Sequence, residues 1–428
     1  MILAQAAAGL ASAVRDSDRA DVVVIGAGPA GSAAAAHLGA AGIDVLVLER
    51  TPSTTARRGA EVLSPRAVAE LDALGLTQAD TEGWHRATGV RFVGGGMRLA
   101  LAWPDVAGRP GRGFVRSRAA LDESLSAYAV SRGARLRRAT EVTGLTTDAS
   151  GRVSGVSADG LTVEAAVVID ASGAGAGVQG ARSGVAATAD FVSPRHSDDH
   201  LESWLELSDA AGTRLPGHGW IVGRGDGHVT VGVGALADDT SATTDKCAFV
   251  LRQWLTALPA NWQLTDATMT APISGSRLGT HRDAGPRYAN GVLRVGDAAQ
   301  LADPLTGEGL TAALASGRVA AEVVAAALAH GTAAEREGVL AAYATLVDGA
   351  LGRRRTLGRV AARLIDRPWI THLATTYALP RERLMKLVLG RLTTPNNPAV
   401  ETCVTPSTMG RVIRAAAHPG TERGVDQR

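Results

Sequence analysis

Residues 22–31 are Val-Val-Val-Ile-Gly-Ala-Gly-Pro-Ala-Gly, and Glu49 follows at the end of the next apolar run. A buried strand that passes directly into Gly-x-Gly-x-x-Gly and then into a helix of small residues is typical of a dinucleotide-binding unit. Gly26 makes the tight turn, Gly28 lets a pyrophosphate approach the backbone, and Gly31 packs the helix against the strand. Glu49 is spaced to accept hydrogen bonds from ribose hydroxyls. This stretch therefore predicts that the chain binds a dinucleotide.

A second cofactor element is expected at residues 294–310. Residues 294–299, Arg-Val-Gly-Asp-Ala-Ala, end a strand, and a long Ala-rich helix begins shortly after them. In this context Asp297 can bind a ribityl or ribose hydroxyl. The amides of Gly309 and Leu310 lie at the positive end of the helix dipole, where they stabilise the anionic edge of a reduced flavin. The structural alternative is that Asp297 caps the helix and the glycines only make turns.

The composition limits the classes of partner. Lys and Arg number 44 against 42 Asp and Glu, the net charge is +2, and no basic block stands out, so we expect no nucleic-acid partner. Cys247 and Cys403 are too far apart for a metal site and too few for a disulfide framework, which indicates a reducing, cytoplasmic compartment and no metal. Residues 1–14 lack a basic leading region, so no signal peptide is expected. The sequence contains no run of 18 or more apolar residues, so we expect no transmembrane segment.

Several motifs together resemble one known family, the FAD-dependent oxidoreductases of the p-hydroxybenzoate hydroxylase fold. In order and spacing they are the opening glycine motif, Glu49, Arg118 in Arg-Ser-Arg-Ala-Ala-Leu, Asp170-Ala-Ser-Gly173, and Gly296-Asp297 through Gly309. Within that superfamily, Gly-Glu-Gly at residues 307–309 and the following Ala-Ala-Leu-Ala-Ser-Gly-Arg are similar to the geranylgeranyl reductase branch. The resemblance covers roughly residues 20–330.

The resemblance implies FAD as the cofactor. The sequence shows no second glycine-rich fingerprint of the same kind. Any NAD(P)H would therefore dock transiently as the reductant, or a protein electron donor would serve instead. The candidate cofactor-binding residues are Gly26, Gly28, Pro29, Ala30, Gly31, Glu49, Arg50, Arg58, Arg118, Val142, Asp297, Pro304, Gly307, Glu308, Gly309 and Leu310.

The same branch implies a motif on the substrate side, Tyr-x-Trp-x-Phe-Pro followed after about eight residues by Gly-x-Gly. Here residues 218–223 are His-Gly-Trp-Ile-Val-Gly and residues 232–234 are Gly-Val-Gly, so the spacing and Trp220 are retained. His218 replaces the tyrosine, and valine and glycine replace the other two residues. His218 is thus a candidate proton donor near neutral pH, and Trp220 a candidate pocket wall. The structural alternatives are that His218 is an ordinary histidine at a strand end and that Trp220 only packs within the sheet.

Residues 57–65, Arg-Arg-Gly-Ala-Glu-Val-Leu-Ser-Pro, are also similar to a motif of flavin-dependent halogenases. That mechanism uses a lysine amine in the N-terminal domain, whereas the first lysine here is Lys246. A guanidinium stays charged and cannot take that role, so we reject a halogenase. Arg58 and Glu61 either line the flavin pocket or belong to a solvated loop.

The resemblance implies a biosynthetic FAD-dependent oxidoreductase that acts on a lipophilic metabolite of the isoprenoid, polyketide or quinone type. Hydride transfer to or from the flavin would reduce or introduce a double bond. An FAD-dependent monooxygenase that hydroxylates or epoxidises is the first alternative, and a non-redox FAD-containing cyclase or isomerase is the second. Aromatic residues make up 4% of the chain, which favours a pocket walled by Leu, Val and Ala. The sequence leaves open the oligomeric state and whether the apolar helices at 370–392 contact a membrane surface.

We therefore expect an α/β (α+β) protein with a p-hydroxybenzoate hydroxylase-like architecture. A Rossmann-type FAD-binding domain, a mixed β-sheet substrate domain and a helical C-terminal region would make up the chain. The predicted boundaries are 1–19 for an N-terminal extension; 20–75, 115–185 and 275–330 for the FAD-binding domain; 76–114 and 186–274 for the substrate domain; and 331–428 for the helical region.

Overall fold

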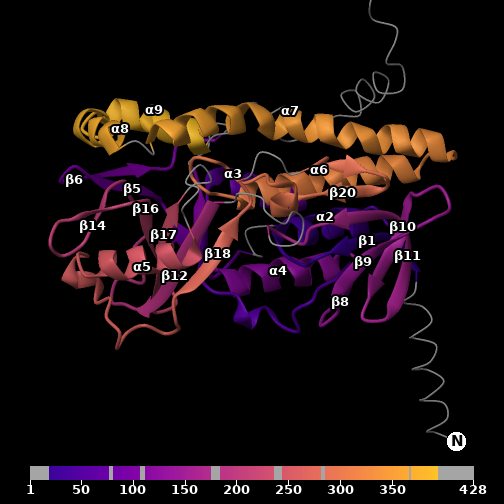
Figure 1. Ribbon diagram of the computed structural model, residues 1–428, viewed down its shortest axis with the longest axis horizontal. Helices are drawn as coiled ribbons and strands as arrows, with labels where there is room; N and C mark the ends of the chain where they lie inside the picture. The colour runs from indigo at the N-terminus through magenta and orange to yellow at the C-terminus, as the bar shows by residue number, and fades with distance from the viewer. Residues whose placement is uncertain are drawn as a thin grey trace, which may run out of the picture.

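The computed structural model describes residues 19–76, 81–106, 111–174, 184–235, 243–280, 285–365 and 368–393. The expected N-terminal extension, apart from its last residue, and the chain after residue 393, with Cys403, lie outside the described residues. Two β-sheets lie side by side, and a layer of long helices crosses one side of both (Figure 1).

The first sheet has eight strands and a parallel centre. Its main path runs β19-β20-β11-β1-β2-β8, and β10 joins β9 to β11 in antiparallel pairs. The two central strands β1 and β2 are apolar on both faces, as expected of strands covered from both sides. Their carboxyl ends lie at one edge of the sheet, which is where α/β folds bind ligands. The bounds are β1 (Arg19–Ile25), β2 (Val45–Leu48), β8 (Arg135–Arg137), β9 (Val142–Thr147), β10 (Val153–Ala158), β11 (Leu161–Asp170), β19 (Tyr288–Ala289) and β20 (Val292–Arg294).

Helices α2 (Pro29–Ala40), α4 (Arg118–Ser131) and α6 (Leu310–Leu328) build the main core with this sheet. Small side chains let α2 and α6 approach closely, because a Cβ built on Gly317 of α6 would lie 2.5 Å from the carbonyl oxygen of Ala30. By length and composition α6 is the one described helix that could cross a membrane, but 83% of that apolar stretch is buried in the protein. Its composition is that of a core helix.

The second sheet runs β18-β12-β17-β16-β13-β5-β6, and α5 (Thr244–Leu255) packs against one face through Trp254. Its strands come from two separate parts of the chain, joined where β5 pairs in parallel with β13. The expected domain boundaries stay a prediction. The bounds are β5 (Gly89–Gly94), β6 (Met97–Ala102), β12 (Gly184–Val192), β13 (His200–Trp204), β16 (His218–Gly223), β17 (His228–Ala235) and β18 (Ser274–Leu278).

Smaller elements connect the two sheets. A three-stranded sheet of order β3-β7-β4 carries the segment that follows the first βαβ unit, and α3 ends at Gly75 in the left-handed conformation (φ 96°). The bounds are η1 (Thr54–Ala56), β3 (Ala60–Leu63), α3 (Pro65–Leu74), β4 (His85–Ala87), β7 (Gly113–Ser117), β14 (Leu207–Ser208), β15 (Arg214–Leu215), η2 (Ala260–Trp262) and η3 (Gly296–Ala299).

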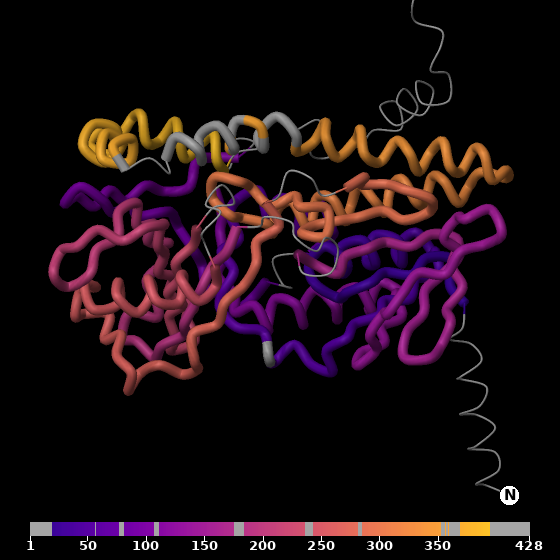
Figure 2. The backbone as a smooth tube through the Cα atoms, in the orientation of Figure 1, coloured from indigo at the N-terminus to yellow at the C-terminus, as the bar shows by residue number. Residues whose placement is uncertain are grey.

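The C-terminal part is helical, as expected. Helix α7 (Ala333–Ile365) lies along α6, and α8 (Pro368–Leu373), the π-helical turn η4 (Ala374–Ala378) and α9 (Glu382–Thr393) lie over β5 and β6 (Figures 1 and 2). Leu379, Met385 and Leu389 share an apolar cluster with Phe92 and Trp103 of the second sheet region. The structure thus confirms the expected α/β class with mixed sheets and a helical C-terminal part.

The contact between α2 and α6 gives the first prediction. In Gly317→Ala the new methyl group must displace the α2 backbone, so the free energy of unfolding should fall by about 1–3 kcal/mol. Gly338 of α7 is the control, because a Cβ there meets nothing within 4 Å; Gly338→Ala should raise that free energy by about 0.5–1 kcal/mol. Urea unfolding measures both variants. Equal stabilities for Gly317→Ala and wild type would show that the two helices are not in close contact.

Candidate cofactor and substrate site

A cavity of about 1480 Å³ is lined by residues of both sheets and of the C-terminal helices. Pockets for a single drug-sized molecule enclose roughly 300–1000 Å³, so this space can hold a dinucleotide and part of a second molecule. Its two ends differ in chemistry. Glycines and charged residues from the carboxyl edge of the first sheet form one end, and apolar side chains of the second sheet and α9 form the other.

The three motif glycines have different surroundings. Gly26 has φ +97° and a Cβ on it would lie 2.7 Å from the carbonyl oxygen of Ala171, so only glycine makes this turn without strain. A Cβ on Gly31 would lie 2.0 Å from the carbonyl oxygen of Gly26. Gly28 lines the cavity, and a Cβ on it would meet nothing within 4 Å. These contacts fit the three predicted roles, since open space remains only where a pyrophosphate would approach the start of α2.

Glu49 is held rigidly at the carboxyl end of β2. Its Oε2 accepts a hydrogen bond from the Ala27 amide (2.9 Å), and its Oε1 accepts from the amide (3.0 Å) and hydroxyl (2.7 Å) of Thr51. Burial alone would raise the pKa of Glu49, but these hydrogen bonds outweigh burial and lower the pKa below its ordinary value. The carboxylate is therefore ionised at neutral pH, and its remaining lone pairs can accept ribose hydroxyls.

Asp297, in η3, lies at the second cofactor element beside the start of α6. A Cβ built on Gly309 would lie 3.2 Å from its Oδ1. Burial raises the pKa of Asp297 to about 6, although the positive charge of Arg118 opposes this. The amides of Gly309 and Leu310 have no hydrogen-bond partner among the described residues, because the first helical bond of α6 runs from Ala313 to Gly309. They remain free to donate to a ligand.

Glu308 has a structural contact that its sequence context did not reveal. Its Oε1 accepts a hydrogen bond from the Thr311 amide at 2.6 Å, so it caps the first turn of α6. The side chain also lines the cavity, and burial raises its pKa. Its predicted role toward the cofactor stays a prediction.

Arg118 is fixed between two acids at the cavity wall. It donates to Glu61 Oε1 (2.6 Å) and to Asp122 Oδ1 (3.0 Å), and Arg57 lies 3.7 Å from the other oxygen of Asp122. Burial would lower the pKa of Arg118, but the two carboxylates raise it further than burial lowers it. Arg118 is therefore a permanent, oriented positive charge, and Glu61 is part of the pocket rather than of a solvated loop.

Most of the other predicted cofactor residues also border the cavity. Pro29, Ala30, Arg50, Arg58, Val142 and Gly307 line it. Gly31 and Pro304 do not line it, since Gly31 packs against the turn and Pro304 is buried near Gly358 of α7. Any role of these two residues is therefore to shape the backbone and not to touch a ligand directly.

The register of β16 and β17 explains the retained substrate-side motif. Trp220 lies opposite Gly232, and His218 lies opposite Gly234. A Cβ on Gly232 would lie 2.2 Å from the Trp220 ring, and one on Gly234 would lie 3.1 Å from the His218 ring. Each ring therefore covers a glycine on the neighbouring strand, an arrangement in which an aromatic side chain replaces the missing packing. Both rings line the cavity, with centroids 5.9 Å apart.

The structure bears on the protonation of His218, whose role as a proton donor stays a prediction. A proton donor near neutral pH would require a pKa close to the ordinary 6.5, but burial lowers the pKa of His218 to about 4. The ring is therefore neutral at pH 7. The neutral ring can donate one hydrogen bond and accept another, but it does not carry an extra proton to deliver.

The apolar end of the cavity was not predicted residue by residue. It combines side chains from β5, β13, the following loop, η4 and α9, which are far apart in sequence. Nothing in the local pattern of any one segment shows that these segments meet. Its principal members are Val90, Phe92, Leu201, Leu205, Met385, Val388, Leu389 and Leu392.

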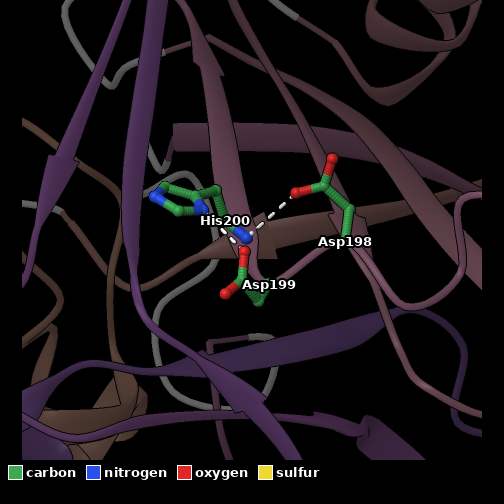
Figure 3. Close-up of side chains that lie close together, drawn as sticks. All are labelled: Asp198, Asp199 and His200. Carbon is green, nitrogen blue, oxygen red and sulfur yellow. Dashed lines mark hydrogen bonds and ion pairs between the residues drawn. The ribbon is translucent and has the colours of Figure 1, made fainter.

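Asp198, Asp199 and His200 form the only group of possible metal ligands among the described residues, with ligand atoms within 4.8 Å of one another. Figure 3 shows both carboxylates turned toward His200. Asp198 also pairs with Arg91 (3.1 Å) and with Arg195, and Asp199 accepts from the Thr88 hydroxyl (2.8 Å). The charge of Asp198 is thus already paired with arginine, and the contacts of both acids attach the start of β13 to the β5 region.

Comparisons with known proteins agree with this geometry. Residues 19–345 match the protein family described as "FAD binding domain". The chain is 34% identical over 395 residues to the menaquinone reductase of Mycolicibacterium smegmatis, covering 88% of this chain and 92% of that protein. It is 30% identical over 337 residues to digeranylgeranylglycerophospholipid reductase 1 of Methanopyrus kandleri, covering 72% and 81%. A geranylgeranyl bacteriochlorophyll reductase-like crystal structure from Thermoplasma acidophilum has the same fold, with TM-score 0.66, 21% identity, and coverage of 94% and 97%.

Gly28 gives a prediction that separates folding from cofactor binding. Its φ of −72° and ψ of −178° suit any residue, and its Cβ position is open, so Gly28→Ala should fold with unchanged stability. The added methyl group would occupy space needed by the pyrophosphate, so FAD should bind roughly tenfold more weakly or worse. Titration of FAD-free protein by flavin fluorescence measures this. Gly144→Ala, on β9 and also in open space, is the control; unchanged FAD affinity in Gly28→Ala would contradict the assignment.

The lowered pKa of His218 predicts a pH dependence of stability. Between pH 6.5 and pH 4 the unfolded chain protonates this ring while the folded protein does not, so stability falls as pH falls. His218→Asn removes that difference. When the pH is lowered from about 7 to 4.5, the free energy of unfolding should fall by about 1–2 kcal/mol less in the variant than in wild type. Urea unfolding at a series of pH values measures it. His37, whose pKa burial also lowers to about 4, is present in both proteins and cancels; parallel curves would refute the burial of His218.

Proposed function

Because this chain belongs to the FAD-binding-domain family of oxidoreductases, whose members similar to it include menaquinone reductase, we propose that it reduces a carbon–carbon double bond in a lipid with an isoprenoid chain. Such a reduction adds one hydride and one proton across the double bond. The lipid quinones and isoprenoid glycerophospholipids named for its relatives are the substrate classes to test first.

The single observation that carries this proposal is that both polar and apolar residues line one cavity. One end is bordered by Gly28, Glu49 and Asp297, and the other by apolar side chains such as Phe92 and Leu389. A polar dinucleotide and a lipid chain can therefore occupy one continuous space. An apolar wall excludes water from that space, which protects a hydride donor from side reactions.

We propose that this chain's own residues hold FAD from both ends. The start of α2 would bind the pyrophosphate, and Glu49 would bind a ribose. Asp297 would bind the ribityl chain. The amides of Gly309 and Leu310 would donate hydrogen bonds to the flavin ring. When bound, FAD supplies the hydride. Arg118 keeps a positive charge beside this site and stabilises negative charge that develops there.

We also propose a transient electron donor and a cytoplasmic location. A nicotinamide nucleotide or a protein donor would reach the cofactor transiently. Among the described residues Cys247 forms no disulfide, and its side chain is buried against β12, which suits the reducing conditions of the cytoplasm.

The test follows both cofactor and product. Under anaerobic conditions, NADPH or dithionite should bleach the flavin band near 450 nm. Adding a menaquinone or a geranylgeranyl lipid should restore the band and yield a product that is heavier by two hydrogen atoms and remains so after exposure to air, which reoxidises any quinol to the quinone. A product heavier by one oxygen atom, formed only in air and labelled from oxygen-18, would instead establish a monooxygenase. An unchanged flavin band with a rearranged substrate would establish the non-redox alternative.

The variant Leu205→Trp tests whether the lipid lies at the apolar end of the cavity. Leu205 is half-buried at the apolar end of the cavity, so the added bulk can enter the cavity without disturbing the core. We expect kcat/KM for the long-chain lipid to fall roughly tenfold, while FAD affinity and flavin reduction stay unchanged. Leu205→Met keeps the volume and should behave as wild type. Equal activity of the tryptophan variant would show that the lipid does not lie there.

A further inference from the structure

The C-terminal helices carry an unusual number of exposed apolar side chains. Six of the eleven large hydrophobic residues that are exposed among the described residues lie between positions 369 and 388. These six define a surface that we call the outer face: Trp369, Leu373, Tyr377, Leu384, Leu387 and Val388. Exposed apolar side chains that gather in one short segment indicate an interaction site, whereas scattered single ones do not.

The outer face is distinct from the side of α9 that packs on the protein. Met385 and Leu389 are buried in the cluster with Phe92 and Trp103, which accounts for one apolar stripe of the helix. Leu384, Leu387 and Val388 have the i, i+3, i+4 spacing of a second stripe, and all three are exposed. One stripe is enough to attach α9 to the sheet, so packing within the described residues leaves the second stripe unexplained.

The charges around the outer face are mostly positive. Between residues 368 and 393 the exposed basic residues Arg381, Arg383, Lys386 and Arg391 outnumber the single acid Glu382. Apolar residues flanked by Lys and Arg on an amphipathic helix are the pattern of an interfacial helix on anionic lipid.

Charge also argues against self-association through this surface. In a two-fold dimer the same face would meet its own copy, so the basic residues of both protomers would lie close together. Repulsion between like charges opposes that pairing. A bilayer with anionic headgroups offers the complementary charge.

The outer face also lies next to the cavity. Val388 is both exposed and part of the cavity lining, and Met385, Leu389 and Leu392 of the same helix line the cavity from within. Figure 1 shows α8 and α9 at one end of the helical layer, above β5 and β6. A lipid that leaves a bilayer at α9 would therefore reach the apolar end of the cavity directly.

We propose that the outer face of α8, η4 and α9 docks on the surface of a bilayer containing anionic lipid, and that the lipid substrate enters the cavity beside α9. The docking step stands on the surface itself, and only the route of entry rests on the proposed function. The apolar side chains lie among the acyl chains near the headgroups, and the basic residues pair with the anionic headgroups.

Flotation of the full-length protein with vesicles tests the docking. Wild type should float with phosphatidylcholine vesicles that contain phosphatidylglycerol, and much less with phosphatidylcholine alone or at high salt. Leu387→Glu replaces an apolar contact by a charge of the same sign as the lipid, so the bound fraction should fall roughly tenfold or more. Phe249→Glu is the control, because Phe249 is 60% exposed on α5, away from α9, and Leu387 is 59% exposed. The control should float as wild type does.

Each result decides the proposal. A wild-type protein that does not float, or a Phe249→Glu variant that weakens as much as Leu387→Glu, overturns it. If wild type does not float and is a dimer that Leu387→Glu converts to a monomer, the proposal is also overturned. The outer face is then the interface with a second copy of the chain. The flavin band, recorded on every sample, shows that the variants are folded. If the protein converts its lipid but never floats, the docking proposal is wrong and the proposed function stands. If it floats but converts no lipid, the proposed function is wrong and the docking proposal stands.

Discussion

The close approach of α2 to the turn after β1 is the contact on which the rest of the site depends. Gly31 leaves no room for a side chain against Gly26, and Gly317 of α6 leaves none against Ala30. These two contacts bring the start of α2 to the cavity and fix α6 against α2. Because both helix starts then border one cavity, we expect their N-terminal amides to act on the same ligand. A wider spacing of α2 and α6 would separate these two positive ends.

Two carboxyl groups at this end of the cavity respond to their surroundings in opposite ways. Glu49 receives three hydrogen bonds, which outweigh its burial and keep it ionised. Asp297 has no comparable set of donors in the described structure, so burial dominates and its pKa is about 6. The first group is thus a fixed acceptor, whereas the second is close to the point of gaining or losing a proton at physiological pH. Only a structure reveals this difference, because both residues are simply acids in the sequence.

The cofactor end was predictable because its residues are local in the sequence. The glycine spacing, Glu49 and the start of α6 each belong to one short segment whose geometry follows from the strand, turn and helix around it. The apolar wall could not be predicted, since Phe92, Leu205 and Leu389 meet only through the pairing of β5 with β13 and the packing of α9. The lowered pKa of His218 could not be predicted from the sequence either, because it results from burial in the folded chain. Local motifs therefore identified the cofactor, and tertiary contacts defined the substrate space.

The pairing of rings with glycines across β16 and β17 has a consequence for how such a pocket can change over evolutionary time. Trp220 and His218 each need the empty space above the opposing glycine, so positions 220 and 232, and likewise 218 and 234, are not independent. A larger residue at Gly232 becomes tolerable only after the Trp220 ring has been reduced in size, and one at Gly234 requires at least a shift of the His218 ring. These positions should therefore behave as epistatic couples, and a laboratory redesign of the pocket would have to exchange both members of a couple in one step.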